Sequence, residues 1–174
     1  MNEPTVYTAL LNAARSAFQA LFQEHNETFY YCTLILSEGA TPFVSAFSEE
    51  ALAAEVQKYE GRYSAEDLRW SYADSPYCGY GYETYFQTVD KLFNEQMSVV
   101  TSDEDYEAAI ESWLSLMEQV MRTLDQEKLF GEGEARSRML INAEIMPPED
   151  DNAERGKRLN SGAIYELWYE ANFA

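Results

Sequence analysis

The chain has 174 residues, of which 31 are Asp or Glu and 12 are Lys or Arg, so its formal net charge is −19 at pH 7. This charge repels nucleic-acid phosphates and anionic membranes, and it speeds encounter with positively charged proteins. Apolar residues make up 46% of the chain, which excludes intrinsic disorder because disordered segments lack the apolar surface that offsets chain entropy. We therefore expect one folded domain over residues 1–174 that binds a basic protein and neither nucleic acid nor a membrane.

The cysteine content and the chain's first residues bear on the compartment. Cys32 and Cys78 are the only cysteines, which is too few for a disulfide framework, and no signal-peptide pattern opens the chain. The longest apolar run is far shorter than the ~20 residues that span a bilayer. These features predict a reduced, cytoplasmic setting. A homo-oligomer is not indicated.

The first third of the chain predicts a helix followed by a hairpin. Apolar residues recur at helical spacing over 5–25, with Pro4 suited to the first turn. Residues 28–36 are almost continuously apolar and rich in strand formers, and a second such run follows at 43–47. Pro42 indicates that the second strand lies at a sheet edge.

The middle of the chain alternates between regular elements and a loop. Ser48 caps a predicted helix that ends near Tyr59. Apolar and polar residues alternate over 68–72, which predicts a third strand. A loop rich in glycine and tyrosine follows, and then a helix over 82–97. Apolar residues at spacings of three and four, Tyr106 among them, predict a long helix over 102–126 with one core-facing side.

The last third of the chain completes the fold prediction. Alternation over 139–145 predicts a fourth strand, and short helices are expected around 152–160 and 164–172. Strands that are not regularly interleaved with helices favour an α+β domain. We predict a largely antiparallel sheet of about four strands that packs against amphipathic helices.

Acidic residues gather on the predicted helix over 102–126. No basic residue lies between Lys91 and Arg122, so the lysines that usually pair with glutamates at i,i+4 are missing. Carboxylates recur every seven residues and share one side of the helix; this acidic ridge consists of Glu104, Glu111, Glu118 and Asp125. The ridge is either a solvated face or a surface for a cationic partner. The candidate partner-binding residues on this helix are Glu104, Glu107, Glu111 and Glu118.

Aromatic residues crowd the segment 70–86. Tyrosine joins a large apolar face to a hydroxyl and is common at protein contact surfaces, whereas core packing is expected for Trp70 and Phe86. The sequence alone leaves open whether the cluster is core or surface. The candidate partner-binding residues in this segment are Asp74, Tyr77, Tyr80 and Tyr82, with the tyrosines expected at the surface.

No residue pattern identifies a catalytic, cofactor or metal site. His25 is the only histidine, and it is expected at a helix end. Cys32 lies in the most apolar strand, where a thiol is buried and inert. We therefore expect no enzyme, no cofactor and no metal. Internal pairing with nearby acid is expected for the basic residues near the carboxyl end, with a small anion site left open; these residues are Arg136, Arg138, Arg155, Lys157 and Arg158.

Residues 69–77 read Arg-Trp-Ser-Tyr-Ala-Asp-Ser-Pro-Tyr, and they follow the strand segment 29–34 and precede a helix at 83–93. Over nearly the whole chain this pattern resembles a bacterial family catalogued as a domain of unknown function, four-three-zero-three in that series. The resemblance implies no activity, cofactor or catalytic residue. At the level of class alone, small acidic families of this kind resemble the immunity proteins of bacterial toxin systems.

The leading hypothesis is an acidic protein that neutralises a basic toxin or effector domain by covering its active or substrate-binding surface. One alternative is a nucleic-acid mimic whose carboxylates replace phosphates on a DNA- or RNA-binding protein. Another is an enzyme or small-molecule binder that uses the region from Trp70 to Tyr82.

Overall fold

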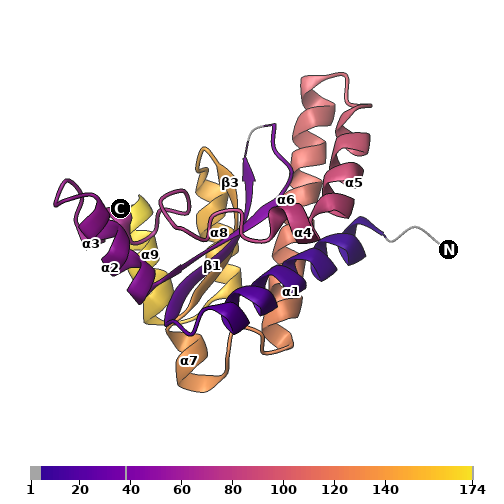
Figure 1. The fold of residues 1–174 in the computed structure, drawn as a ribbon. Helices are drawn as coiled ribbons and strands as arrows, with labels where there is room; N and C mark the ends of the chain where they lie inside the picture. Colours follow the sequence, from indigo (N-terminus) through magenta and orange to yellow (C-terminus); the bar gives the residue numbers. More distant parts are fainter. Residues whose placement is uncertain (1–4, 38, 174) are drawn as a thin grey trace.

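The fold combines helices with one small sheet (Figure 1). The computed structural model describes residues 5–37 and 39–173, so Pro4 and part of the turn between the first two strands lie outside the described residues. In chain order the elements are α1 (Val6–Glu24), β1 (Phe29–Ser37), β2 (Phe43–Ser48), α2 (Glu49–Lys58), α3 (Ala65–Leu68), α4 (Tyr82–Tyr85), α5 (Gln87–Met97), α6 (Asp103–Gln126), α7 (Gly133–Ser137), β3 (Leu140–Met146), α8 (Asp150–Leu159) and α9 (Ala163–Phe173).

The sheet confirms the α+β class and corrects the strand count and pairing. Its described strands number three, in the order β2-β1-β3. β1 pairs with β2 in antiparallel fashion, as the hairpin prediction requires, but it pairs with β3 in parallel. The sheet is therefore mixed and not largely antiparallel. β2 lies at an edge, as Pro42 predicts.

The predicted third strand at 68–72 is wrong. Ser64 begins the short helix α3 instead, because its Oγ accepts a hydrogen bond from the Asp67 N–H at 3.2 Å. The Asp67 carboxylate in turn accepts from the Ser64 N–H at 2.7 Å, which completes a capping box. Trp70 lies just after this helix and packs edge-on against Tyr30 and Tyr31 of β1.

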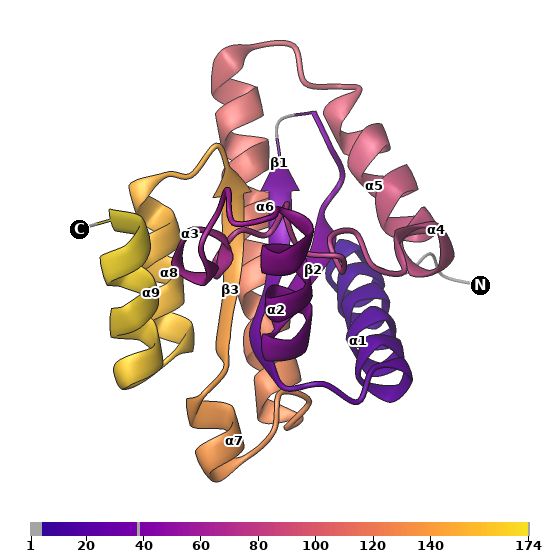
Figure 2. The ribbon, with the colours of Figure 1, turned by 60° about the vertical axis from the view of Figure 1, so that its left-hand side comes forward.

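Helices cover the central strand on both faces. In Figure 2, α6 passes behind the sheet and α2 lies in front of it. Residues 29–36 of β1 are all buried, which explains why the segment reads as a continuous apolar run instead of an alternating one. The predicted helix over 82–97 is divided at the fully buried Phe86 into α4 and α5. None of the described helices is long and apolar enough to cross a lipid bilayer.

Candidate functional site

The carboxyl ends of β1 and β3 meet at one edge of the sheet. The two parallel strands are in register up to Ser37 and Met146, the last residue of each. Sheets with parallel strands commonly bind ligands outside these ends. A hollow of about 230 Å³ lies here, between α6 and the β3–α8 connection, and is lined by Leu36, Ser37, Tyr106, Ile110, Ile145, Met146, Pro147 and Glu149.

Tyr106 separates this hollow from a second one. The second hollow has a volume of about 270 Å³ and is lined by Gly39, Phe93, Asn94, Met97, Val100 and Tyr106. Tyr106 was expected on the core side of its helix, but 37% of its surface is exposed because it lies in the first turn, beyond the packed part of α6. We call the residues that line the two hollows the Tyr106 surface. α5 and α6 run side by side to this end of the molecule (Figure 1).

Carboxylates without a cationic partner border the Tyr106 surface. Glu107 and Glu111 directly follow the lining residues Tyr106 and Ile110, and both are exposed. Among residues 5–37 and 39–173, no Lys or Arg lies within ion-pair distance of the carboxylates on this rim. No ion pair at the surface therefore relieves their mutual repulsion. The rim consists of Glu104, Glu107, Glu111, Glu149, Asp150 and Asp151.

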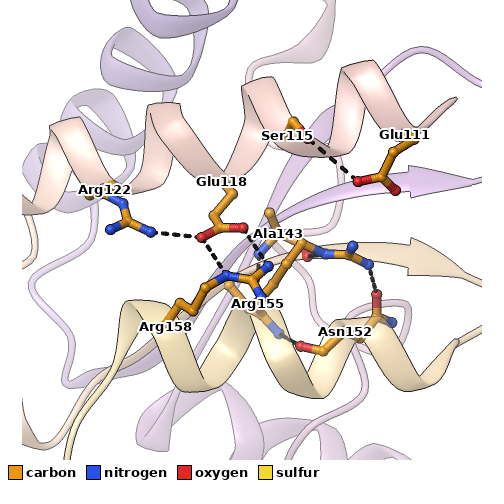
Figure 3. Close-up of polar contacts among 9 residues, drawn as sticks. Glu111, Ser115, Glu118, Arg122, Ala143, Asn152, Arg155 and Arg158 are labelled. Carbon is orange, nitrogen blue, oxygen red and sulfur yellow. Dashed lines mark hydrogen bonds and ion pairs between the residues drawn. The ribbon is translucent and has the colours of Figure 1, made fainter. Parts of the chain in front are cut away.

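A buried arginine of α8 lies close to the acidic rim (Figure 3). Only 3% of Arg155 is exposed, and its Nε donates to the Ala143 carbonyl and its Nη2 to Asn152 Oδ1, each at 2.8 Å. Burial lowers the pKa of Arg155, whereas the charges of Glu111 and Asp151 raise it. Arg155 thus ties α8 to β3 and places one positive charge beneath the acidic rim.

Comparison with known protein families matches residues 10–161 to a domain of unknown function, DUF4303. The chain belongs to the DUF4303 family. This confirms the resemblance carried by the Arg69-Trp70-Ser71 segment, and the matched span includes the Tyr106 surface and its rim. Comparison with curated proteins and with solved structures gave no match.

In this DUF4303 protein the acidic ridge is interrupted at Glu118. Its Oε1 accepts from Arg122 Nη2 at 2.7 Å and from Arg158 Nε at 2.9 Å, and its Oε2 accepts from Arg158 Nη2 at 2.7 Å (Figure 3). Only 13% of the Glu118 side chain is exposed. Burial alone would raise the pKa of Glu118, but the two arginines outweigh it and lower the pKa. The prediction that Glu118 lies on a free solvent face is wrong because α8 packs against this part of α6.

Of the basic residues near the carboxyl end, Arg136, Arg138 and Arg158 pair with carboxylates, as expected, whereas Arg155 and Lys157 form no ion pair within the described residues. Arg136 forms an ion pair with Asp125, the last member of the ridge, at 2.5 Å, and it also donates to the Met139 carbonyl at 2.7 Å. Arg138, the residue after α7, pairs with Glu134 in the first turn of that helix. The ridge therefore keeps free carboxylates only toward the amino end of α6.

The tyrosine-rich loop is packed against the body of the protein. Gly79 donates its N–H to the Val44 carbonyl at 2.9 Å, which attaches the loop to β2. Tyr77 is 7% exposed and its hydroxyl donates to Glu27 at 2.8 Å, so the expectation that Tyr77 lies at the surface is wrong. Burial raises the pKa of Tyr77, and the hydrogen bond to Glu27 adds to the shift.

The other candidates in this segment also use their polar groups internally. Tyr80 and Tyr82 are half-buried, and their hydroxyls donate to Glu24 and, at 2.9 Å, to Asp90. The Asp74 carboxylate accepts from the Tyr59 hydroxyl at 2.8 Å. The structure thus does not bring the aromatic candidates together with the acidic ones. Tyr77 contacts His25 at the carboxyl end of α1, whereas the rim lies at the amino end of α6.

Side chains suited to metal binding or nucleophilic chemistry do not converge on this surface. Within residues 5–37 and 39–173, His, Cys, Asp and Glu form no group that could hold a metal ion. Cys32 is fully buried, as predicted, and burial raises the pKa of its thiol. What the Tyr106 surface offers is an aromatic side chain, apolar hollows and carboxylates that form no ion pair within the described residues, a combination that suits binding.

Proposed function

We propose that this DUF4303 protein is a cytoplasmic, non-enzymatic inhibitor that binds a basic toxin or effector domain through the Tyr106 surface. The bound protein would cover the active or substrate-binding surface of its partner. The observation that carries the proposal is the exposed Tyr106 between two apolar hollows, bordered by carboxylates that form no ion pair among the described residues. A cationic surface would relieve the repulsion on this rim.

Tyr106 and the acidic rim have distinct roles in this proposal. Buried aromatic residues near the centre of an interface usually supply most of its binding energy, and Tyr106 has hollows on both sides for side chains of the partner. Peripheral charge acts mainly on the association rate and on the choice of partner. With a net charge of −19, the whole protein directs a basic partner toward the rim.

The ion pairs of Glu118 and Asp125 count against the nucleic-acid mimic. A mimic needs a continuous row of free carboxylates to replace phosphates, whereas two of the four ridge members are held by arginines of the same chain. What is left is a short acidic rim around an aromatic residue. This arrangement favours recognition of a folded basic protein.

The proposal can be tested with the protein encoded by the gene that neighbours the gene of this protein. If that gene encodes a secreted protein with a toxin-like carboxyl-terminal domain, the domain is expressed with and without the parent protein, and growth and the dissociation constant are measured. We expect the parent to restore growth and Tyr106→Ala to weaken binding about tenfold or more. Tyr63→Ala is the matched control, because Tyr63 is 49% exposed and lies outside the Tyr106 surface. Absence of rescue by the parent, or equal binding by the Tyr106 variant, would contradict the proposal.

A further inference from the structure

A cavity of about 410 Å³ lies at the opposite edge of the sheet, where β1 begins. It is formed by the end of α1, the start of β1 and the segment between α6 and β3. Three phenylalanines form an aromatic wall, in which Phe22 is half-buried and Phe29 and Phe130 are buried, so Phe22 supplies most of the accessible surface of the wall. The ring centroids of Phe22 and Phe29 are 5.1 Å apart, and those of Phe22 and Phe130 are 6.5 Å apart. No function argued above uses this cavity.

Glu27 lines the cavity and carries a charge without a counterion. Its two carboxylate oxygens accept from the Tyr77 hydroxyl, each at 2.8 Å, and Oε2 also accepts from the Ser48 hydroxyl. Both donors are neutral. No Lys or Arg in the part of the chain that the structure describes lies within ion-pair distance of Glu27. The hydroxyls fix the carboxylate in place, and they leave its negative charge without an ion-pair partner among the described residues.

His25 adds a second hydrogen-bond acceptor to the same cavity. Because the Tyr77 hydroxyl donates its proton to Glu27, its oxygen accepts from His25 Nδ1, which lies 3.2 Å away. This network places a proton on His25 Nδ1. In the neutral ring Nε2 is then the acceptor, and it has no hydrogen bond within residues 5–37 and 39–173.

Arg138 also lines the cavity but does not make it an anion site. Its side chain is 74% exposed and forms an ion pair with Glu134, so its charge is already compensated at the mouth. The groups that remain are a fixed carboxylate, a ring nitrogen acceptor and an aromatic wall. An aromatic face attracts a cation, and a carboxylate accepts charge-assisted hydrogen bonds from it.

We propose that this cavity binds a small organic cation, an amidinium or ammonium group carried on a planar apolar body. The body packs against the wall formed by Phe22, Phe29 and Phe130, and the N–H donors of the head group reach Glu27 and His25 Nε2. The site does not depend on the proposed inhibitor function, because it lies at the other edge of the sheet from the Tyr106 surface.

Benzamidine and its neutral isostere benzamide provide the test. Calorimetry on the full-length protein should show that benzamidine binds about tenfold or more tightly than benzamide, because only benzamidine carries the charge. His25 is the only histidine, so its ring signals in NMR report on the cavity without ambiguity, and they should shift with benzamidine. Equal binding of the two compounds, no binding at millimolar concentration, or unchanged His25 signals would overturn the proposal.

A matched pair of variants then tests whether Glu27 supplies the negative charge that binds benzamidine. Glu27→Gln should weaken benzamidine binding about tenfold or more, whereas Glu24→Gln should leave it unchanged. The two glutamates are well matched, because Glu24 accepts a hydrogen bond from the Tyr80 hydroxyl and Glu27 accepts one from the Tyr77 hydroxyl. Only Glu27 lines the cavity. If the two substitutions weakened benzamidine binding equally, net charge alone would attract the cation, and the proposed site would be wrong. The comparison of the two compounds on the parent protein decides the question if Glu27→Gln does not fold.

Discussion

Arg158 of α8 holds the carboxylate of Glu118 on α6 with two hydrogen bonds, from Nε at 2.9 Å and from Nη2 at 2.7 Å. The two residues are 40 positions apart in the chain, so the pair joins elements that only the tertiary structure brings together (Figure 3). It also divides the acidic side of α6. The carboxylates near the amino end are free, whereas Glu118 and Asp125 stabilise the fold.

Glu118→Gln should lower the free energy of unfolding by about 1–2 kcal/mol, because two arginines lose a charged acceptor in a half-buried setting. Since its folded pKa is lowered, the stabilisation by Glu118 is present above the unfolded pKa of ~4.3 and is lost as the pH falls through the folded pKa. Urea denaturation at pH 7 and pH 3 measures both effects. A loss of stability that is the same at the two pH values would contradict the ion-pair explanation.

Glu107→Lys should raise the free energy of unfolding, whereas Glu118→Gln lowers it. Glu107 and Glu111 are like charges at i,i+4, so the reversal should raise the free energy of unfolding by about 0.2–0.5 kcal/mol. It should also slow association with the basic partner at low salt, and the difference from the parent should shrink as salt screens the charges. Stopped-flow association rates over a range of ionic strength check this. Rates that are the same for parent and variant at low salt would remove the rim from the binding surface.

Tyr77→Phe should destabilise the protein by about 1–2 kcal/mol. The substitution keeps the ring but removes the hydroxyl that donates to Glu27 and accepts from His25. Tyr63→Phe is the control, because Tyr63 is exposed and its hydroxyl makes no hydrogen bond within the described residues. Thermal unfolding of both variants gives the comparison. Equal melting temperatures would mean that the Tyr77 network contributes nothing to stability.

Glu144→Gln should flatten the pH dependence of stability. Glu144 is buried in β3 beside Tyr31, and burial raises its pKa above the unfolded value. Its contribution is therefore fully present below the unfolded pKa of ~4.3 and is lost as the pH rises through the folded pKa, by ~1.4 kcal/mol for each unit between the two values. Denaturation between pH 4 and pH 8 measures the slope. A slope that is the same in the parent and in Glu144→Gln would contradict this explanation.

Local patterns predicted the elements that local interactions determine. The Ser102 cap and the apolar spacing that follows it define α6, and the continuous apolar run at 29–36 defines β1. The alternation of apolar and polar residues at 68–72 predicted a strand wrongly because it extends over only five residues. The capping box of Ser64 and Asp67 favours a helix there and outweighs it. No local signal reports that β1 pairs with β3 in parallel, since the partners lie 109 residues apart, as Thr33 and Asn142 do.

The binding surface was predicted only in part, for a similar reason. Charge composition identified the free carboxylates of Glu104, Glu107 and Glu111, because they belong to one helix. Periodicity places Tyr106 on the apolar side of that helix, but it does not show how far the helix extends beyond the sheet. The arginine that holds Glu118 comes from α8, which helical spacing within α6 cannot reveal.

The long separation between β1 and β3 in the chain affects folding while the protein is being synthesised on the ribosome. β1 and β2 follow one another in the chain and can pair early, whereas the partner for the other edge of β1 is made only about 100 residues later, on the order of ten seconds at typical rates of synthesis. During that time a strand composed almost entirely of apolar residues presents unpaired backbone groups to other nascent chains. Chaperone dependence during synthesis should therefore be concentrated in the interval before residues 140–146 leave the exit tunnel.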